Sequence, residues 1–233
     1  MKVQRFTDDP ALTEAFVRFG FDLYRNDPRW IPPFREDVRR QLSPVTGLAH
    51  RPGDDAAHFL AQDERGLVGR ISAFVNSDLE EDGEPLGTIG FFESVEDVDV
   101  ARELFAAARA WLLEAHGIAR VWGPMNFDIW HDYRLMTRGF SRDPFSGEPW
   151  NKDYYPGLFA RCGWEPLRTW ESVDLDERGI QQTIDWGTRR HRRALEAGYR
   201  FRDIDSTHFE SELGILHGVL SASYAGFLGY TPI

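Results

Sequence analysis

The most regular hydrophobic pattern in the chain lies between positions 101 and 115. Apolar side chains recur there at helical spacing, three and four residues apart. They are Ala101, Leu104, Phe105, Ala108, Trp111, Leu112 and Ala115. Gly117 follows and suits the left-handed conformation that ends many helices. β-rich runs at 86–92 and 118–122 flank this helix, so the region predicts a crossover that joins two parallel strands.

Upstream of the crossover, shorter patterns predict two helices and a hairpin. Strands are predicted at 2–6, 58–62 and 67–76, and helices from 10 to about 26 and over 35–42. Asp9 supplies a cap and Pro10 a first-turn proline for the first helix. Residues 43–55 are a predicted loop. The polar segment 77–85 is rich in acids and turn-forming residues, so we expect a mobile connection there.

Downstream of the crossover, the hydrophobic pattern is less regular. It predicts a mixed segment at 126–140, a short helix at 154–161, one or two strands within 164–175, a helix at 177–197, a strand-like run at 199–205 and a helix from 206 to about 224. No internal repeat or low-complexity tract is evident. Residues 198–233 are too few to bury a core of their own.

Composition predicts a soluble globular protein of the cytoplasm. Hydrophobic residues make up 42% of the 233 positions, and no apolar run is long enough for a transmembrane helix. The single cysteine, Cys162, cannot form an internal disulfide and fits a buried helix end, and the N-terminus lacks the apolar run of a signal peptide. The formal net charge of −11 predicts that nucleic acid and anionic membranes are repelled.

An acidic turn follows the strand at 86–92. Glu93, Glu96, Asp97 and Asp99 stand between that strand and the long helix. Such turns bind phosphate in many αβ proteins, because free backbone N–H groups and the positive end of the helix dipole meet there. Four carboxylates facing the same spot would oppose a diphosphate. Capping of a helix that binds no anion is the alternative interpretation.

Six runs along the chain carry a family resemblance. They are YRNDPRWIPP (24–33), VGRISAFVN (68–76), GTIGFFES (87–94), GPMNF (123–127), WHDYRLMTRGF (130–140) and EPWNKDYYPGLFARCGW (148–164). As a set they resemble bacterial two-domain proteins of the GNAT N-acetyltransferase superfamily, over most of residues 20–175. The resemblance implies an α/β fold with a mixed, mostly antiparallel GNAT-like sheet, splayed central strands and flanking helices.

The resemblance also implies a cofactor and a domain boundary. In this family the pantetheine arm of acetyl-CoA lies along one strand, here 86–93, and its diphosphate rests on the following loop, here 94–99. The cofactor-binding residues expected on this basis are Phe91, Phe92, Ser94 and Val95. Residues 1–197 are expected to form a GNAT-like domain, and 198–233 to open a second, incomplete one. The glycine-rich cofactor loop usual in that second domain is absent from this chain.

Amide formation from a thioester needs proton transfer, and three residues are candidates for it. Glu93 lies at the carboxyl end of a strand whose apolar neighbours would desolvate it, which suits a general base. Tyr154 and Tyr155 are candidates for the acid that protonates a thiolate leaving group. The alternatives are helix capping for Glu93 and anchoring of core edges for the tyrosines.

The run NFDIWHDYR gathers polar side chains beside aromatic ones. Asn126, His131, Asp132, Tyr133 and Arg134 supply donors, acceptors and a titratable imidazole, as in sites that hold a small polar ligand. They are the candidate substrate-binding residues. A buried polar network that ties a loop to the sheet explains them equally well.

Histidines and arginines add little to the chemistry. The seven histidines show no metal-binding spacing, so no metal site is predicted. Four arginines between 189 and 193 form the one basic cluster of the chain. A solvated helix whose arginines pair with acids of the same protein is favoured over a nucleic-acid site.

Two hypotheses of function follow from these observations. The first is acyl-CoA-dependent N-acyl transfer, with acetyl-CoA as donor and a small-molecule amine as acceptor. The second is a non-catalytic GNAT-like module that binds a small polar or cationic ligand, or supports a catalytic domain, for instance through a homodimer surface. The acidic turn favours the second, because carboxylates attract cations and discourage the coenzyme. Binding of nucleic acid through the arginine cluster is the weakest alternative.

Overall fold

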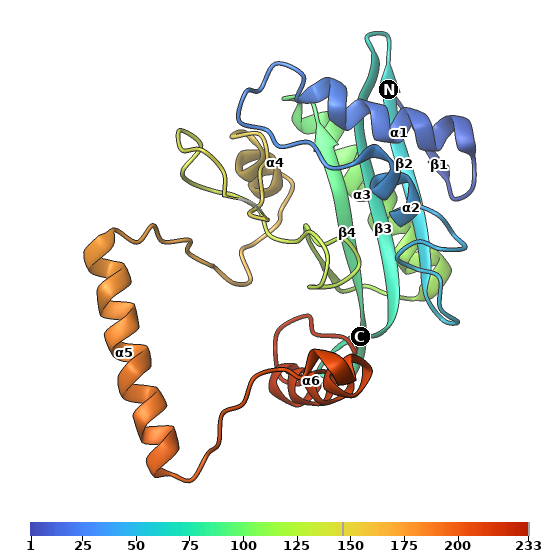
Figure 1. Cartoon of the computed structure of the whole chain (residues 1–233). Coiled ribbons are helices and arrows are strands. Elements are labelled where there is room, and N and C mark those ends of the chain that lie inside the picture. The colour runs from blue at the N-terminus through green and yellow to red at the C-terminus, as the bar shows by residue number, and fades with distance from the viewer. Residues whose placement is uncertain (146, 233) are drawn as a thin grey trace. The chain divides into compact units, whose positions relative to one another are not determined.

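The centre of the structure is a five-stranded sheet in the order β1-β2-β3-β4-β5. In this computed structural model, which describes residues 1–145 and 147–232, the strands are β1 (Lys2–Phe6), β2 (Asp55–Asp63), β3 (Gly66–Glu81), β4 (Glu84–Ser94) and β5 (Val121–Trp122). The first four pair antiparallel, and β5 pairs parallel with β4 (Figure 1). The predicted crossover is therefore confirmed.

Helices cover both faces of the sheet (Figure 1). The helices α1 (Pro10–Leu23) and α2 (Arg35–Gln41) pack on one face, around Phe16 and Leu60. On the other face, α3 (Val98–His116) and α4 (Tyr155–Arg161) pack around Phe92. The predicted α/β class, with a mixed and mostly antiparallel sheet between helices, is confirmed.

The ends of α1 and α3 follow the local rules that the sequence suggests. Asp9 accepts two backbone hydrogen bonds of 2.9 and 3.0 Å at the start of α1, and Pro10 is its first residue. Asp97 caps α3 by accepting from the Asp99 amide at 3.0 Å. Gly117 ends α3 with a φ of 71°, in the left-handed region. A side-chain cap of this kind stabilises a helix by about 1 kcal/mol.

An aromatic cluster fixes α3 and α4 against the carboxyl half of β4. The ring centroids of Phe92 and Phe105 lie 4.7 Å apart, and those of Phe92 and Phe159 lie 5.2 Å apart. Trp164 closes the cluster at 5.3 Å from Phe105. Each such pair adds about 0.5–1.5 kcal/mol to the stabilisation from buried area, so the end of β4 is held firmly.

The strands β4 and β5 separate after a short parallel ladder, as the resemblance implies. They pair only at Gly87↔Val121 and Thr88↔Trp122, and the Met125 amide then donates to the Ile89 carbonyl at 2.7 Å. Beyond this point β4 continues to Ser94 without a strand on that side. Opposite β3 it also carries a bulge, because residues 91 and 92 both face Ile71. Phe91 in the bulge has a φ of 48°.

The segment 77–85 is not the mobile connection expected from its composition. The strands β3 and β4 form one long hairpin, with Glu81 opposite Glu84. The turn residues Asp82 and Gly83 have φ values of 57° and 78°. Asp-Gly is the preferred pair for a two-residue hairpin turn in which both residues take positive φ. The Asp-Gly pair therefore indicates a hairpin turn, whereas the acidic residues around it had indicated a mobile connection.

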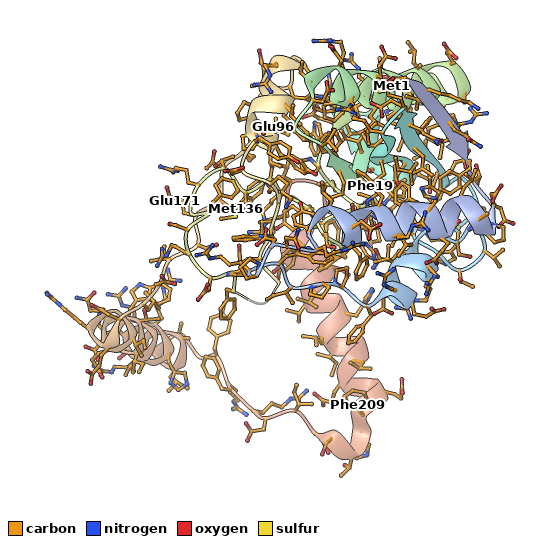
Figure 2. All side chains as sticks on the ribbon, turned by 90° about the horizontal axis from the view of Figure 1, so that it is seen from above. Met1, Phe19, Glu96, Met136, Glu171 and Phe209 are labelled. Atoms are coloured by element: carbon orange, nitrogen blue, oxygen red, sulfur yellow. The ribbon has the colours of Figure 1, made fainter. Side chains whose placement is uncertain are left out.

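The later helices are confirmed, but the strands predicted near them are wrong. The helix α5 (Glu177–Glu196) follows a loop. The helix α6 (Phe209–Tyr224) follows a 3₁₀ turn, and its first residue is labelled in Figure 2. Residues 164–175 and 199–205 form no strand. A β-rich run needs a neighbouring strand to complete its hydrogen bonds, and no strand is described between Pro166 and Ser223.

Contacts divide the chain into two compact units. One is Met1–Glu165 with Tyr224–Ile233, and the other is Pro166–Ser223. The expected division into domains at 1–197 and 198–233 stays a prediction. None of the described helices combines the length and apolar composition that crossing a membrane requires.

The turn after α6 repeats the turn after α1, although no repeat was evident from the sequence. Tyr24 and Trp30 stack with ring centroids 5.0 Å apart at 17°. Tyr224 and Tyr230, each 200 positions later, stack at 6.4 Å and 25°. In both turns the third residue after the tyrosine donates its amide to the tyrosine carbonyl, at 2.9 and 2.8 Å. The two segments share only the aromatic positions and one proline, so their sequences alone do not indicate a repeat.

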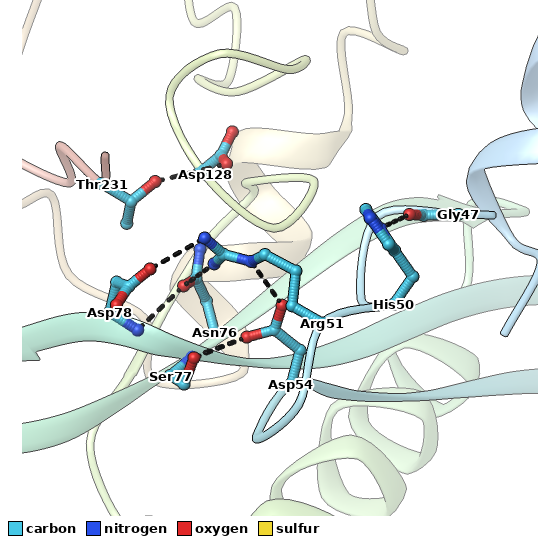
Figure 3. Close-up of polar contacts among 9 residues, drawn as sticks. All are labelled: Gly47, His50, Arg51, Asp54, Asn76, Ser77, Asp78, Asp128 and Thr231. Atoms are coloured by element: carbon cyan, nitrogen blue, oxygen red, sulfur yellow. Dashed lines mark hydrogen bonds and ion pairs between the residues drawn. The ribbon is translucent and has the colours of Figure 1, made fainter. Parts of the chain in front are cut away.

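The loop before β2 is fixed to β3 by a network of charged and polar side chains around Asp54 (Figure 3). Arg51 donates to Asp54 at 3.0 Å and forms an ion pair of 2.9 Å with Asp78. The Asp54 side chain is fully buried and accepts from the Ser77 amide and hydroxyl, both at 2.9 Å. Asn76 accepts from Arg51 at 3.2 Å. The predicted loop therefore has a defined conformation.

His58 is a buried neutral base within the sheet. Its Nδ1 lies 2.8 Å from the Ser72 hydroxyl and its Nε2 lies 3.2 Å from the Leu42 carbonyl. A carbonyl only accepts, so Nε2 carries the proton and Nδ1 accepts from Ser72. Burial lowers the pKa of His58 from 6.5 to about 4.

We expect the free energy of unfolding to fall as the pH drops from 6.5 to 4. In this range the unfolded chain binds a proton at His58 that the folded chain does not, so acid favours unfolding, by at most about 1.4 kcal/mol per pH unit. Urea denaturation at several pH values measures this slope, and His58→Asn should flatten it. An imidazole NMR signal of His58 that titrates near its ordinary pKa in the folded protein would contradict the prediction.

Candidate functional site

Glu93 stands near the carboxyl end of β4, and its side chain is turned into the protein. Only 16% of that side chain is exposed, so water solvates the carboxylate poorly. The Tyr155 hydroxyl donates a hydrogen bond of 2.5 Å to its Oε2. The structure thus brings together the two residues that the sequence suggested as base and acid. Whether they act in catalysis stays a prediction.

Arg70 supplies the counter-charge, and sequence reasoning missed it. It lies on β3 directly opposite Glu93, with Nη2 at 3.7 Å from the Glu93 Oε1. Its Nη1 donates to the Phe16 carbonyl at 2.9 Å. Gly20 of α1 makes room for the guanidinium, because a Cβ there would lie 2.7 Å from Nη2. The sequence feature that could have identified Arg70 is its position as a charged residue inside the β-rich run VGRISAFVN.

Tyr24 is a second residue beside Glu93 that the sequence analysis did not select. Its side chain is 1% exposed, and its hydroxyl meets no acceptor at hydrogen-bonding geometry. Trp30 stacks on its ring, and the Lys152 Nζ lies 4.3 Å from the ring centroid. Burial, followed by the nearby negative charge of Glu93, raises the pKa of Tyr24. Tyr24 therefore remains a neutral proton donor beside the carboxylate.

Burial dominates the electrostatics of this cluster. It raises the pKa of Glu93, against the charge of Arg70 and the hydrogen bond from Tyr155, which lower it. It also raises the pKa of Tyr155, and the Glu93 charge adds to that effect. The Glu93 carboxylate therefore takes up a proton more readily than an exposed carboxylate does, whereas the tyrosine hydroxyls keep their protons.

The tyrosine pair also clamps the peptide groups of Ser94. The Ser94 amide donates to the Tyr155 hydroxyl at 2.9 Å, and the Tyr154 hydroxyl donates to the Ser94 carbonyl at 2.8 Å. Burial raises the pKa of Tyr154. The anchoring role that the sequence offered as an alternative for these tyrosines is therefore present, alongside the contact of Tyr155 with Glu93.

The β4 backbone predicted to bind the cofactor already has partners within the chain. The Phe91 amide donates to Asn126 Oδ1 at 2.8 Å, and the Val95 amide donates to the Val68 carbonyl at 3.0 Å. Phe92 belongs to the core cluster. Gly90 lies against the same amide group, since a Cβ there would be 2.2 Å from Asn126 Oδ1. Cofactor binding by these residues stays a prediction.

The four acids of the turn do not face the same spot, contrary to expectation. Glu93 is turned inward to Arg70, whereas Glu96 is exposed. Asp97 caps α3 and lies 3.3 Å from Arg65, and Asp99 pairs with Arg102. Capping, the alternative interpretation, therefore describes Asp97, and arginines neutralise part of the negative charge at this helix end.

The candidate substrate-binding residues form a small loop closed by backbone contacts. Met125 bridges Tyr133, the Asn126 amide donates to the Asp132 carbonyl at 2.8 Å, and the Arg134 amide donates to the Pro124 carbonyl at 3.1 Å. Through its side chain, Asn126 ties this loop to the β4 bulge. The arrangement agrees with a structural network, and ligand binding by the loop stays a prediction.

His131 has a carboxylate partner that the sequence analysis did not select. Its Nδ1 lies 2.6 Å from Asp128 Oδ1, and the Asp128 side chain is 8% exposed. Thr231, 3.4 Å from the other Asp128 oxygen, belongs to the segment after α6 (Figure 3). Asp128 lies in NFDIWHDYR, three residues before His131, which is the signal that could have identified it.

Metal-binding groups do not gather in the described structure. Across residues 1–145 and 147–232, no three side chains of His, Cys, Asp or Glu are placed to hold an ion together. Cys162 follows α4 as its half-buried C-cap residue.

No family model matches the chain, but two curated proteins are similar to most of it. Protein YghO of Escherichia coli (strain K12) is 26% identical over 226 residues, which are 94% of this chain and 55% of that protein. Bacterial ceramide synthase of Caulobacter vibrioides is 28% identical over 228 residues, which are 96% of this chain and 58% of that protein. The chain spans about half the length of the curated relatives it matches.

Solved acetyltransferase structures show a weak likeness. An aminoglycoside acetyltransferase from an uncultured soil metagenomic sample, in complex with sisomicin, is 16% identical with a TM-score of 0.41, covering 75% of this chain and 93% of that one. A predicted acetyltransferase with acetyl-CoA from Clostridium acetobutylicum is 9% identical with a TM-score of 0.43, covering 75% and 96%. At these sequence identities and TM-scores, a proposal of function has to rest on the residues of this chain.

We expect Tyr155→Phe to raise the pKa of Glu93 further, because the hydroxyl stabilises the charged carboxylate. Tyr154→Phe is the matched control, since its hydroxyl donates to the Ser94 carbonyl instead. Carboxyl ¹³C NMR of glutamate-labelled protein measures the titration, with the Glu93 signal assigned through Glu93→Gln. An equal shift in both variants would refute the direct bond between Tyr155 and Glu93.

Proposed function

We propose that the chain is part of an N-acyltransferase that acts on a small amine, with Glu93 as the group that accepts the amine proton. One observation carries the proposal. A buried carboxylate, in direct contact with a buried tyrosine hydroxyl and an arginine, lies at the end of β4, where that strand has lost its parallel neighbour.

The chemistry follows from the protonation states of the cluster. An amine is mostly an ammonium ion at neutral pH, and it becomes a nucleophile only after losing a proton. Glu93 is suited to take this proton because burial raises its pKa. Tyr155 stays protonated, so it orients the Glu93 carboxylate by donating to it. Arg70 lies close enough to balance the charge while Glu93 is ionised.

A coenzyme A diphosphate does not fit the loop at 94–99 as this loop is arranged. The amides of Ser94 and Val95 already have partners in the chain, and the Asp97 side chain accepts from the Asp99 amide in the first turn of α3. A diphosphate needs such amides free, and usually a basic group beside them. The proposed contribution of this chain is therefore on the amine side of the reaction, and acetyl-CoA as the donor remains an expectation from the family resemblance.

The name of one relative supports acyl transfer to an amine. One is named bacterial ceramide synthase, and a ceramide contains an amide formed from an acyl group and an amine. The sequence resemblance to GNAT N-acetyltransferases points to the same reaction class. A homodimer and a cytoplasmic location stay predictions.

A second candidate is a non-catalytic module that binds a cationic ligand. The observation that favours it is the occupied edge of β4, where Asn126 and Tyr155 satisfy the amides of Phe91 and Ser94. A domain whose donor-binding groups are already paired can retain an amine site without catalysing transfer. Glu93 would then serve as the anionic partner of the ligand.

We expect Glu93→Gln to lower acyl transfer by about 10²- to 10⁴-fold, the usual contribution of a positioned general base. The measurement is thiol release from acetyl-CoA in the presence of a panel of primary amines. Glu96→Gln is the matched control, because it removes an exposed carboxylate of the same turn.

Calorimetric titration separates the two candidates. Heat on addition of acetyl-CoA, with thiol release that Glu93→Gln abolishes and Glu96→Gln preserves, supports catalysis. If acetyl-CoA gives no heat at millimolar concentration and no thiol is released, catalysis by this chain is excluded. An amine that then binds the natural sequence but not Glu93→Gln supports the non-catalytic module.

A further inference from the structure

The helix α5 has one apolar side and one basic side. Ile180, Ile184, Gly187, His191 and Leu195 recur at spacings of three and four, so they lie along one stripe of the helix. We call these five residues the α5 stripe. The opposite side carries Arg178, Arg189, Arg192 and Arg193, with Asp185 and Glu196 among them.

Nothing within the unit Pro166–Ser223 covers most of the α5 stripe. Ile180, Ile184 and Leu195 are 49%, 54% and 50% exposed, and no residue of α5 is buried. A Cβ on Gly187 would meet no atom within 4 Å. The one ring contact recorded on the stripe is between His191 and Phe201, with centroids 4.4 Å apart. Figure 2 draws side chains around the whole circumference of this helix.

Trp186 and Arg190 stand together at the edge between the two sides. The Arg190 guanidinium lies 4.3 Å from the centroid of the Trp186 ring, and Trp186 is 52% exposed. A tryptophan with an apolar ring and a polar N–H is favoured at the boundary between lipid chains and headgroups. An arginine beside it can reach headgroup phosphates while its stem stays on apolar surface.

The local charge of α5 is opposite to that of the chain. The helix carries five arginines against Glu177, Asp185 and Glu196, whereas the whole chain has a formal net charge of −11. Among the ion pairs of the described residues, none includes an arginine of α5, so the expected pairing with acids of the same protein is not seen. These cations are available to an external anionic surface.

We propose that α5 binds flat on the surface of an anionic phospholipid membrane. The α5 stripe then enters the boundary of the acyl chains, and the arginines lie at the phosphates. A nucleic acid would engage the arginines but leave the apolar stripe in water. An anionic bilayer accommodates both sides together, along a helix of 20 residues that is about 30 Å long.

The proposal revises an expectation drawn from the net charge. Repulsion by the acidic body acts over a distance of about 8 Å in physiological salt, whereas a cationic helix side makes direct contact with lipid headgroups. Three large aliphatic residues on the stripe are few, so binding should be reversible and should require anionic lipid.

Cosedimentation of the whole chain with lipid vesicles tests the proposal. We expect binding to vesicles of phosphatidylcholine with one third phosphatidylglycerol at low salt, and little binding to phosphatidylcholine alone. Replacing Arg189, Arg192 and Arg193 by Gln should lower the partition coefficient by about tenfold or more. The control replaces Arg5, Arg18 and Arg109, which are exposed arginines of the other unit, and changes the net charge equally.

A second pair of variants tests the apolar side. Ile180→Ser with Ile184→Ser should weaken vesicle binding by about tenfold, whereas Val45→Ser with Leu113→Ser, a pair at least as exposed, should leave it unchanged. Circular dichroism checks that the variants remain folded. The proposal is overturned if anionic vesicles are not bound, if both serine pairs have the same effect, or if a DNA duplex binds as well as the vesicles with no loss in Ile180→Ser/Ile184→Ser.

Discussion

The burial of Glu93 opposite Arg70 is the interaction on which the candidate site depends. Burying two ions costs several kcal/mol for each unless further hydrogen bonds compensate. Here Tyr155 donates to the carboxylate and the Phe16 carbonyl accepts from the guanidinium. The compensating groups come from α4 and α1, on opposite faces of the sheet. The pair therefore fixes β3, β4 and both helices in one arrangement, and Gly20 is needed because the arginine fills the space of its side chain.

The separation of β4 from β5 creates the second constraint. A strand that loses its neighbour leaves amides that must find partners, since unpaired buried N–H groups are strongly disfavoured. In this chain Asn126 and Tyr155 satisfy the amides of Phe91 and Ser94. The same two side chains are held by a backbone-closed loop and by the Glu93 cluster. Any ligand that hydrogen-bonds to the β4 edge must displace them, so the edge is linked energetically to the Glu93 cluster.

Sequence patterns predicted the fold better than the site, for a physical reason. Helical periodicity and end residues such as Gly117 are local, so α1, α3 and α5 were found with nearly correct ends. The candidate pair Glu93 and Tyr155 was also identified, because a carboxylate after an apolar strand suggests desolvation. Arg70 and Tyr24 were missed, since their importance arises from register and packing that one residue type does not reveal. The strand prediction at 164–175 was wrong because no partner strand is described near that run.

The main obstacle to binding a diphosphate differs from the one that the sequence suggested. Counting carboxylates in the turn predicted strong repulsion, yet Glu93 is directed inward, and Arg65 and Arg102 offset Asp97 and Asp99. Repulsion between exposed and screened charges is weak in water. Occupied amides are the larger barrier, because an incoming phosphate must first break hydrogen bonds that the chain makes to itself. Charge totals therefore describe neither this turn nor α5 well, as both depend on where each charged group lies relative to its partners.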